Sequence, residues 1–495
     1  MCGIAGAINY KKYDIKKVEV SLYHRGPNEQ STYCKNNIAL IHTRLSIQDI
    51  SHGQQPLHYL NEQYSIVFNG EIYNHMSLRE DLNEFSFSTT SDTETLLYLY
   101  IKYKEQMYDK IDGMFAFAII DKKENKLVLG RDRAGKKPLF LYKDEDSLFF
   151  ASELNAIKSG VPKLDIDETN ISAYMRCGFF YNDKTPYQNV EEVQAGHFYN
   201  IDLTSLEIER NRYFDILNYY ENPTTLSFDE SLNKLDSLLH TSIKERLLSS
   251  DLEVGAFLSG GIDSSLVVAI ASEYKENLKT FTVKFDGAYD ESYLAKLTAQ
   301  KYNTEHTEIS ISMNLKDDIE KILLNYGQPF MDSSAIPSYY VSQEAKKHVT
   351  VILNGDGADE LFGGYRRYVP AANNWIQIAS KMTFLLKFLP NPHNKKSFYN
   401  YFYRLLSMSS KEGLDFYLSS TYDIYEDVYQ VKENAVTNLM NKFIKDVKLN
   451  DLSKMLYLDF NLLLFSDLLV KMDIATMANS LEGRSPFLSR HMLEF

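Results

Sequence analysis

The stretch from residue 254 to residue 271 constrains the fold of this chain more than any other feature. A strand-forming run, Val254–Leu258, enters the turn Ser259-Gly260-Gly261, and an apolar run typical of a helix, Leu266–Ala271, leaves it. A strand, a glycine loop and a helix start in this order make a nest of backbone N–H groups that can hold an anion. In an ordinary α/β domain the glycines would serve only to make the turn. The pattern therefore predicts an α/β domain, with an anion site as one interpretation of its loop.

A second segment, Val349–Leu353, predicts another strand, and it is followed by Asn354-Gly355-Asp356 and by Asp359. Carboxylates at the end of a strand, close to a phosphate loop, are suited to Mg²⁺ and pyrophosphate. Their order and spacing do not fit a Ca²⁺-binding loop. A solvated acidic turn is the alternative interpretation.

The N-terminus offers a different kind of chemistry. Removal of Met1 would give Cys2 both a thiol and a free α-amine, which titrates at about 7.7–8.0. Such an amine can accept the proton of its own nucleophile in acyl transfer. We expect Gly3 and Gly6 to let the backbone approach a substrate closely. A buried first strand that merely has a small apolar residue at position 2 is the alternative.

The string Gly130–Lys137 nearly spells the phosphate-binding loop of kinases and ATPases. However, Lys137 replaces the hydroxyl that such a loop needs, and Asp132 would sit where the phosphate belongs. The surrounding runs, Lys126–Leu129 and Pro138–Tyr142, predict strands around a turn rather than a strand that leads into a helix. We therefore reject a phosphate site in this string.

The N-terminal third of the chain resembles the glutamine amidotransferase domain of the N-terminal-nucleophile hydrolases, in the form found in the glutamine-hydrolysing asparagine synthetase family. The matching pieces, in chain order, are Met1–Gly6, His24–Pro27, Arg44–Ile47, Phe68–Asn74 and Ser91–Glu94. Asn28 stands where the family usually has Asp, which we interpret as a loop variation of small consequence. The resemblance implies that Cys2 is the catalytic nucleophile that attacks glutamine.

The same resemblance assigns the other residues that would handle glutamine. Hydrolysis of an amide passes through an oxyanion, to which Asn69-Gly70 offers a side-chain amide and an unshielded N–H, although this dipeptide is also a strong hairpin signal. Arg44 can bind the α-carboxylate through two hydrogen bonds. Asp92, with Glu71 nearby, is the counter-charge for the α-ammonium. The implied glutamine-binding set is Arg44, Leu45, Ser46, Asn69, Gly70, Glu71 and Asp92.

The second half of the chain resembles the ATP pyrophosphatase domain of the same family through the loop at 259–264 and the acidic segment at 354–359. The resemblance implies ATP and Mg²⁺ as cofactors, with Asp263 and Asp359 as the metal-supporting carboxylates. Asp356 is implied as a catalytic general base, at a position where many members carry glutamate. The implied nucleotide and pyrophosphate contacts are Leu258, Ser259, Gly260, Gly261, Asp263, Ser264, Val283, Asn354, Gly355 and Lys471.

Three further stretches fit the same domain. Asp290-Glu291-Ser292 and His306 follow with family-like spacing, and Lys471 and Arg484 are implied to face an anionic substrate or phosphate.

The implied fold is α/β in class, with an α+β N-terminal domain. A four-layer αββα domain over residues 1–215 would precede a parallel-sheet α/β domain of the ATP-pyrophosphatase (HUP-like) type over residues 228–495. The polar stretch Asn218–Phe228 is expected to link them. Since family members usually continue beyond the residues that correspond to Pro486–Leu488, we expect this chain to lack the usual C-terminal extension.

The implied activity is glutamine-dependent synthesis of asparagine from aspartate and ATP, by way of a glutamyl thioester and β-aspartyl-AMP. Two alternatives stay open. One is amidation of another carboxylate, such as a uronic acid in a surface polysaccharide, which Asp356 and the shortened end would favour. The other is a non-catalytic module that senses nucleotide or glutamine.

Composition narrows the class of partners. A net charge of −14 argues against a nucleic-acid surface, and no apolar run approaches the ~18 residues of a membrane span. The cysteines at 2, 34 and 177 lack metal or disulfide spacing, and we expect Cys34 and Cys177 to be buried thiols. We expect a cytoplasmic enzyme with small-molecule substrates, no nucleic acid and no membrane span, and a homodimer as its candidate assembly.

Overall fold

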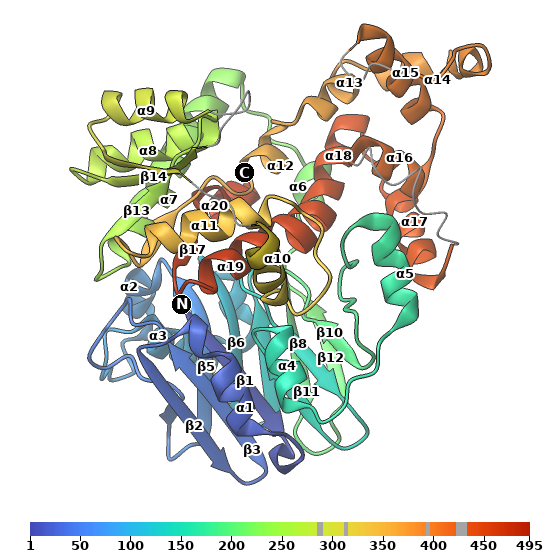
Figure 1. The fold of residues 1–495 in the computed structure, drawn as a ribbon. Coiled ribbons are helices and arrows are strands. Elements are labelled where there is room, and N and C mark those ends of the chain that lie inside the picture. The colour runs from blue at the N-terminus through green and yellow to red at the C-terminus, as the bar shows by residue number, and fades with distance from the viewer. Residues whose placement is uncertain (285–290, 311–314, 393–396, 422–432) are drawn as a thin grey trace.

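Two antiparallel six-stranded sheets form the N-terminal domain in the computed structural model of the chain (Figure 1). The structure describes residues 1–284, 291–310, 315–392, 397–421 and 433–495. Across the first sheet the strands are β10 (Val190–Glu192), β8 (Phe140–Lys143), β9 (Leu148–Ala151), β1 (Cys2–Ile8), β3 (Ile38–Arg44) and β2 (Glu29–Lys35). Across the second they are β12 (Ile208–Arg212), β11 (His197–Asp202), β7 (Lys126–Arg131), β6 (Gly113–Asp121), β5 (Tyr64–Ile72) and β4 (Leu57–Tyr59).

The two sheets face each other across one apolar core, to which both contribute buried aliphatic side chains such as Leu40 and Val67. On the outer faces, α1 (Ile15–Ser21) and α4 (Leu154–Gly160) cover the first sheet. The helix α3 (Asp92–Tyr103) covers the second sheet. The order helix, sheet, sheet, helix confirms the predicted αββα layering.

All seven residues of β1 are buried in the middle of the first sheet. A Cβ on Gly3 would lie 2.5 Å from Thr43 Oγ1, and one on Gly6 would lie 2.4 Å from the ring of Phe150. Both glycines therefore make room for side chains of neighbouring strands. The prediction that they make room for a substrate is wrong.

A parallel sheet forms the C-terminal domain. Within the described residues its strand order is β15 (Glu305–Ser310), β14 (Lys279–Lys284), β13 (Val254–Phe257), β16 (Val351–Leu353) and β17 (Glu482–Arg484). One face is covered by α7 (Phe228–Leu248), α8 (Ile262–Tyr274) and α9 (Ser292–Lys301), and the other by α11 (Ala335–Ala345). Burial on both faces explains the apolar runs in the sequence and confirms the predicted α/β fold. The strand order reverses between β13 and β16, which is where open α/β sheets bind ligands.

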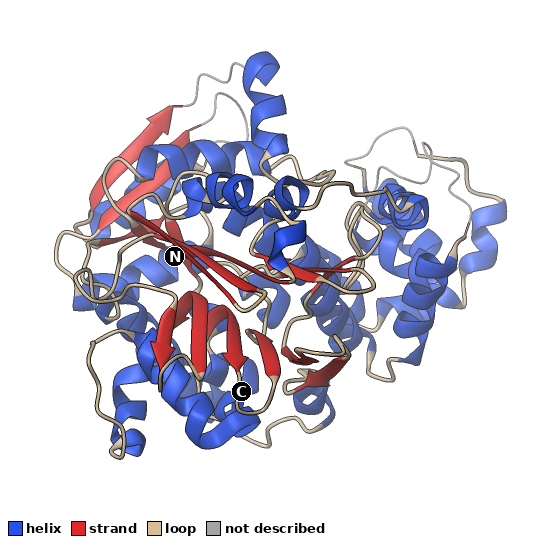
Figure 2. Ribbon diagram, turned by 90° about the horizontal axis from the view of Figure 1, so that it is seen from below, coloured by secondary structure: helices blue, strands red, loops and turns tan. Residues whose placement is uncertain are grey.

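A largely helical segment leaves the parallel sheet and returns to it (Figure 1). Its longer helices are α15 (Phe398–Ser409), α16 (Gly413–Thr421), α17 (Ala435–Asp446) and α18 (Asp451–Asp459). A π-helical stretch, Phe460–Leu468, then leads directly into α19 (Leu469–Met477), which packs near β17. Seen from below in Figure 2, the strands lie among helices and the helical segment stands to one side. No helix of the described residues is both long and apolar enough to cross a membrane.

The predicted linker at 218–228 is partly helical. The short helix α6 (Leu217–Glu221) covers the beginning of this stretch. The helix α7 begins at its last residue, Phe228, with a capping box formed by Ser227 and Glu230. Cys177 is buried as predicted, but Cys34 is exposed. The prediction for Cys34 is wrong because it lies on β2, the edge strand of its sheet.

Buried ion pairs join the two domains. Asp473 on α19 accepts hydrogen bonds from Arg25 Nη1 at 2.8 Å and from Lys137 Nζ at 3.0 Å. Arg25 also binds Glu153 at 2.8 Å, and its Nε donates to the Cys2 carbonyl at 3.2 Å. Although burial alone would raise the pKa of Asp473, the two cations hold it well below its usual value. This carboxylate therefore ties the start of β1 to the C-terminal domain.

We expect Asp473→Ala to destabilise the protein by about 3–5 kcal/mol, because it leaves two buried cations without their counter-charge. Urea unfolding followed by circular dichroism would measure the loss. Asp165→Ala, which removes the partner of Lys163 in an exposed ion pair, serves as the control and should change stability little. Equal effects of the two substitutions would contradict a special role for the buried pairs.

Candidate active site

Cys2 begins β1 and lies where the two N-terminal sheets meet. Its backbone N–H donates to Asn69 Oδ1 on β5 at 3.1 Å, and β3 places Arg44 opposite it. Cys2 is 9% exposed. Burial is the largest effect and raises the pKa of its thiol above the usual value, although the Met1 α-amine, the Leu45 amide and Arg44 act in the opposite direction. These groups favour the thiolate, the form that attacks a carbonyl.

Asn69 and Gly70 lie inside β5 and not in a turn, so the hairpin interpretation is excluded. Asn69 is fully buried, and its Nδ2 finds no hydrogen-bond partner among the described residues. A buried donor without an acceptor costs free energy, which a ligand oxygen would recover. A Cβ on Gly70 would lie 2.1 Å from the Met114 carbonyl oxygen, so strand pairing alone already requires glycine there.

Glu71 and Asp92 concentrate buried negative charge beside these residues. Asp92 is the first residue of α3, and its Oδ2 accepts the Ile72 N–H at 2.9 Å. Burial raises the pKa of Asp92 to about 6. Burial and the charge of Asp92 raise the pKa of Glu71 well above its usual value, although Arg484 lies 3.4 Å from Glu71. An ammonium group would be stabilised here.

Arg44 is buried, and its guanidinium donates to the carbonyl oxygens of residues 48–50. It also lies 3.4 Å from Glu29. These hydrogen bonds hold the loop after β3 in place. The predicted pairing of Arg44 with the glutamine α-carboxylate would have to form in addition to them. The nearby Ser46 N–H donates to Asn28 Oδ1 at 3.0 Å, an oxygen that Asp would also supply.

The Met1 α-amine reaches the C-terminal domain, where it lies 2.8 Å from Glu482 Oε2 in a buried ion pair. Arg484 Nε donates to Glu482 at 2.6 Å. Burial would raise the pKa of Glu482, but the amine and Arg484 lower it to about 2. Arg484 is itself fully buried between Glu482 and Glu71. The prediction that it faces an anionic substrate or phosphate is therefore wrong.

A cavity of about 440 Å³ lies beyond the carboxyl ends of β13, β14 and β16. Among the described residues, no side chain caps the first turn of α8, whose N-cap is Gly261, so the free N–H groups of that turn point toward the loop. This end of a helix is suited to a phosphate group. The predicted residues that line the cavity are Leu258, Ser259, Gly260, Gly261, Asp263, Ser264, Val283, Asn354, Gly355 and Asp356.

Asp263 lines this cavity, and Asp359 lies close enough to raise its pKa, in addition to the effect of burial. Burial raises the pKa of Asp359 as well. A divalent cation relieves such repulsion, and proteins bind Mg²⁺ through one or two carboxylates together with substrate phosphates. The described residues contain no group of three His, Cys, Asp or Glu side chains suited to a metal. The donor set thus fits Mg²⁺ held jointly with a phosphate.

Lys471 and Asp359 are not among the described residues that line the cavity. Lys471 pairs instead with Asp332 at 2.8 Å, and its contact with phosphate stays a prediction. Asp290 lies outside the described residues, whereas Glu291 lines the cavity. Sequence reasoning missed the contribution of α11, from which Pro337, Ser338 and Val341 line one wall. That helix carries no motif that could have identified it.

Asp356 Oδ2 accepts hydrogen bonds from Asn354 Nδ2 at 2.7 Å and from Lys136 Nζ at 3.0 Å. Lys136 comes from the string rejected as a phosphate loop. In that string, Asp132 accepts the backbone N–H groups of Lys136 and Lys137 at 2.9 and 3.0 Å. The amides of the loop already hold a carboxylate of their own, which supports the rejection.

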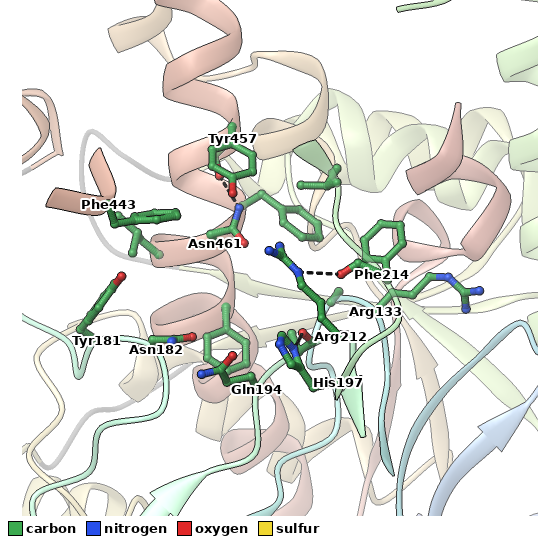
Figure 3. A pocket seen from close by; sticks show the side chains of 16 residues that line it. Arg133, Tyr181, Asn182, Gln194, His197, Arg212, Phe214, Phe443, Tyr457 and Asn461 are labelled. Atoms are coloured by element: carbon green, nitrogen blue, oxygen red, sulfur yellow. Dashed lines mark hydrogen bonds between the residues drawn. The ribbon is translucent and has the colours of Figure 1, made fainter. Parts of the chain in front are cut away.

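A second cavity, of about 230 Å³, lies between the N-terminal domain and the π-helical stretch (Figure 3). Its walls include the aromatic rings of Phe443 and Tyr457 and the side chain of Arg212, whose Nε donates to the Phe214 carbonyl at 3.1 Å. This cavity shares no lining residue with the first, so it lies outside the candidate nucleotide site.

The N-terminal αββα domain carries a buried cysteine at the start of its first strand. It is joined to a parallel-sheet domain with a glycine loop at its switch point. Together the two domains define a class of two-domain, nucleotide-dependent amidotransferases. Comparison with family models agrees. The model described as glutamine amidotransferase domain matches residues 1–214, and the one described as asparagine synthase matches residues 234–495. The chain belongs to the asparagine synthase family.

Relatives span most of the chain. Asparagine synthetase [glutamine-hydrolyzing] 1 of Bacillus subtilis (strain 168) is 35% identical over 99% of this chain and 80% of its own length. The putative asparagine synthetase [glutamine-hydrolyzing] 2 of Methanocaldococcus jannaschii is 35% identical over 74% of this chain and 76% of its own length. Among solved structures, the glutamine PRPP amidotransferase of B. subtilis covers 72% of this chain and 75% of its own at 15% identity. Its TM-score of 0.31 is too low to carry an argument.

The raised pKa of Asp92 predicts the pH dependence of glutamine hydrolysis. Only the ionised carboxylate pairs with an ammonium group, so kcat/KM for glutamine should fall as the pH drops through about 6. Since kcat/KM reports the free enzyme, the fall should be larger in kcat/KM than in kcat at saturating glutamine. Glutamate release measured from pH 5 to pH 8 would check this. A kcat/KM that stays constant down to pH 5 would contradict it.

Proposed function

We propose that this protein is a glutamine-dependent asparagine synthetase, which converts aspartate, glutamine, ATP and water to asparagine, glutamate, AMP and diphosphate. The observation that carries the proposal is the pairing of two sites across one buried boundary. A thiol beside an unpartnered amide donor lies in the first domain, and a cavity with acidic residues at a helix N-terminus lies in the second. The names of the relatives support the same reaction.

In the first half-reaction we assign the attack on glutamine to Cys2. Once Met1 is removed, the α-amine of Cys2 would take the thiol proton while sulfur adds to the side-chain carbonyl. Asn69 Nδ2 would donate to the oxyanion. Collapse of this intermediate returns the proton to the leaving nitrogen and expels ammonia. Water then releases glutamate from the thioester and restores the thiol. Arg44, Glu71 and Asp92 would hold the α-groups of glutamine.

In the second half-reaction a carboxylate oxygen of aspartate attacks the α-phosphorus of ATP, and diphosphate leaves. The loop at 259–264 and the start of α8 would hold the diphosphate. Asp263 and Asp359 would hold Mg²⁺, which neutralises phosphate charge when bound. Ammonia then attacks the acyl carbon of β-aspartyl-AMP, AMP leaves, and Asp356 takes the proton from the nitrogen.

Ammonia must reach the second site without escaping into water. Tyr73 and Met114 of the first domain and Met477 of the second belong to one buried cluster, in which Met1 also lies before its removal. Arg25 contacts the Cys2 carbonyl and also binds Asp473 of the second domain. We therefore place the route of ammonia along this buried boundary.

Three predictions from the sequence extend the proposal. A cytoplasmic location suits an enzyme that depends on a reduced thiol. A homodimer stays a prediction, as does the absence of nucleic acid among its partners.

Cys2→Ala should lower glutamine-dependent asparagine formation by at least about 1,000-fold, because it removes the nucleophile. Ammonium chloride should still support asparagine formation by the same variant. Cys34→Ala, at an exposed thiol, is the matched control and should behave as wild type. The measurement is asparagine, AMP and diphosphate, each quantified per turnover. AMP formed only with a carboxylate other than aspartate would favour the alternative acceptor.

Asp263→Asn should lower ammonia-dependent AMP formation by about 100-fold, since a carboxylate that would hold Mg²⁺ beside the phosphates is lost. Glutamine hydrolysis by the same variant should persist. Asp236→Asn, on the exposed side of α7, provides the control. Undiminished AMP formation by Asp263→Asn would contradict the assignment of this site.

A further inference from the structure

Lys136 belongs to the N-terminal domain, yet its ammonium group binds Asp356, which lines the candidate nucleotide cavity of the C-terminal domain. Its side chain is 4% exposed, and Nζ lies 3.0 Å from Asp356 Oδ2. The two residues are 220 positions apart in the chain. Asp356 lines the cavity and is 17% exposed. The N-terminal domain thus supplies a charge to a site that is otherwise built by the C-terminal domain.

The turn that carries Lys136 is held rigidly. Asp132 accepts the N–H groups of Lys136 and Lys137, which fixes the backbone from within. Gly135 has φ +73°, and a Cβ there would lie 2.5 Å from the ring of Phe465, so the turn packs tightly against the π-helical stretch. A lysine on this turn has little freedom to reach another partner.

Asp356 is held through one of its two oxygens. Oδ2 accepts from Lys136 Nζ, from Asn354 Nδ2 at 2.7 Å within its own segment, and at 3.4 Å from Ser485 Oγ, which also donates to Asn354 Oδ1 at 2.7 Å. Two other segments of the chain therefore reach Asp356. Among the described residues, none donates a hydrogen bond to Oδ1. The carboxylate is therefore oriented by Oδ2 and keeps Oδ1 available.

Stability alone is a weak explanation for this buried ion pair. Removing two charges from water is costly, and apolar residues of similar volume often serve stability equally well or better. A buried lysine whose ammonium meets the carboxylate of a cavity is therefore better explained by the placement of that carboxylate.

We propose that Lys136 is a positioning residue for the amination step, which fixes Asp356 so that Oδ1 takes the proton from ammonia as it attacks the acyl-adenylate. This inference rests on the proposed function of the C-terminal domain. It implies that amination depends on the N-terminal domain even when ammonia is supplied directly and glutamine is absent.

The test uses the full-length protein with ammonium chloride, aspartate and Mg·ATP. Lys136→Met should lower kcat for asparagine formation by about 10- to 100-fold, a loss typical of a misplaced catalytic group, with KM for ATP little changed. Lys136→Arg, which keeps a cation, should recover much of the rate. Lys163→Met removes a lysine that is 79% exposed from its own ion pair and is the matched control. Glutamine hydrolysis by each variant reports whether the protein has folded.

A double mutant separates positioning from a merely structural role. If Lys136 acts through Asp356, Lys136→Met should add no further loss in an Asp356→Asn background. Losses that multiply would overturn the inference, as would wild-type kcat in Lys136→Met or an arginine variant no better than methionine. A wild-type protein that forms no AMP from ammonia, aspartate and ATP would overturn the proposed function and the inference with it. Wild-type activity with an unimpaired Lys136→Met would overturn the inference alone.

Discussion

The bridge from Asp473 to Arg25 and Lys137 is the interaction on which the geometry of both candidate sites depends. Arg25 holds the carbonyl of Cys2, so the strand that presents the thiol is anchored to α19. Lys137 shares a rigid turn with Lys136, so the same carboxylate also anchors the turn that reaches Asp356. A buried charge is tolerated only where its partners saturate it. One saturated carboxylate thus sets the position of two chemical groups that are far apart in the chain.

Charge is balanced differently at the boundary and at the sites. At the boundary, the carboxylates of Asp473 and Glu482 face cations, which hold their pKa values below the usual range. At the sites, Asp92 and Asp263 lie in buried or half-buried surroundings that raise their pKa values. The folded chain therefore leaves carboxyl groups without a counter-charge where a ligand would bring an ammonium group or a divalent cation. Binding such a ligand would relieve an electrostatic cost that folding leaves in place.

Local sequence patterns predicted those parts of the structure that local physics determines. The strand and glycine loop before α8 lie where the apolar run and Gly260-Gly261 indicated, and the acidic segment follows β16 as expected. The αββα order followed from the resemblance of short motifs, of which Arg44–Ile47 begins at the end of β3 and Ser91–Glu94 lies at the start of α3. The roles of Gly3 and Arg484 could not be inferred in this way. Each depends on a neighbour brought close by tertiary packing: Thr43 for the glycine, and Glu71 for the arginine.

The string at 130–137 illustrates this limit most clearly. A phosphate site in this string could be rejected from the string alone, because Asp132 and Lys137 do not fit a phosphate loop. The structure explains the likeness, because a loop rich in free N–H groups does hold an anion, namely its own Asp132. With the anion site satisfied internally, the two buried lysine side chains point away from the loop and pair with Asp356 and Asp473. The side chain of Lys136 has no role within the loop itself, yet it binds Asp356 of the other domain. This partner becomes visible only when the two domains are packed together.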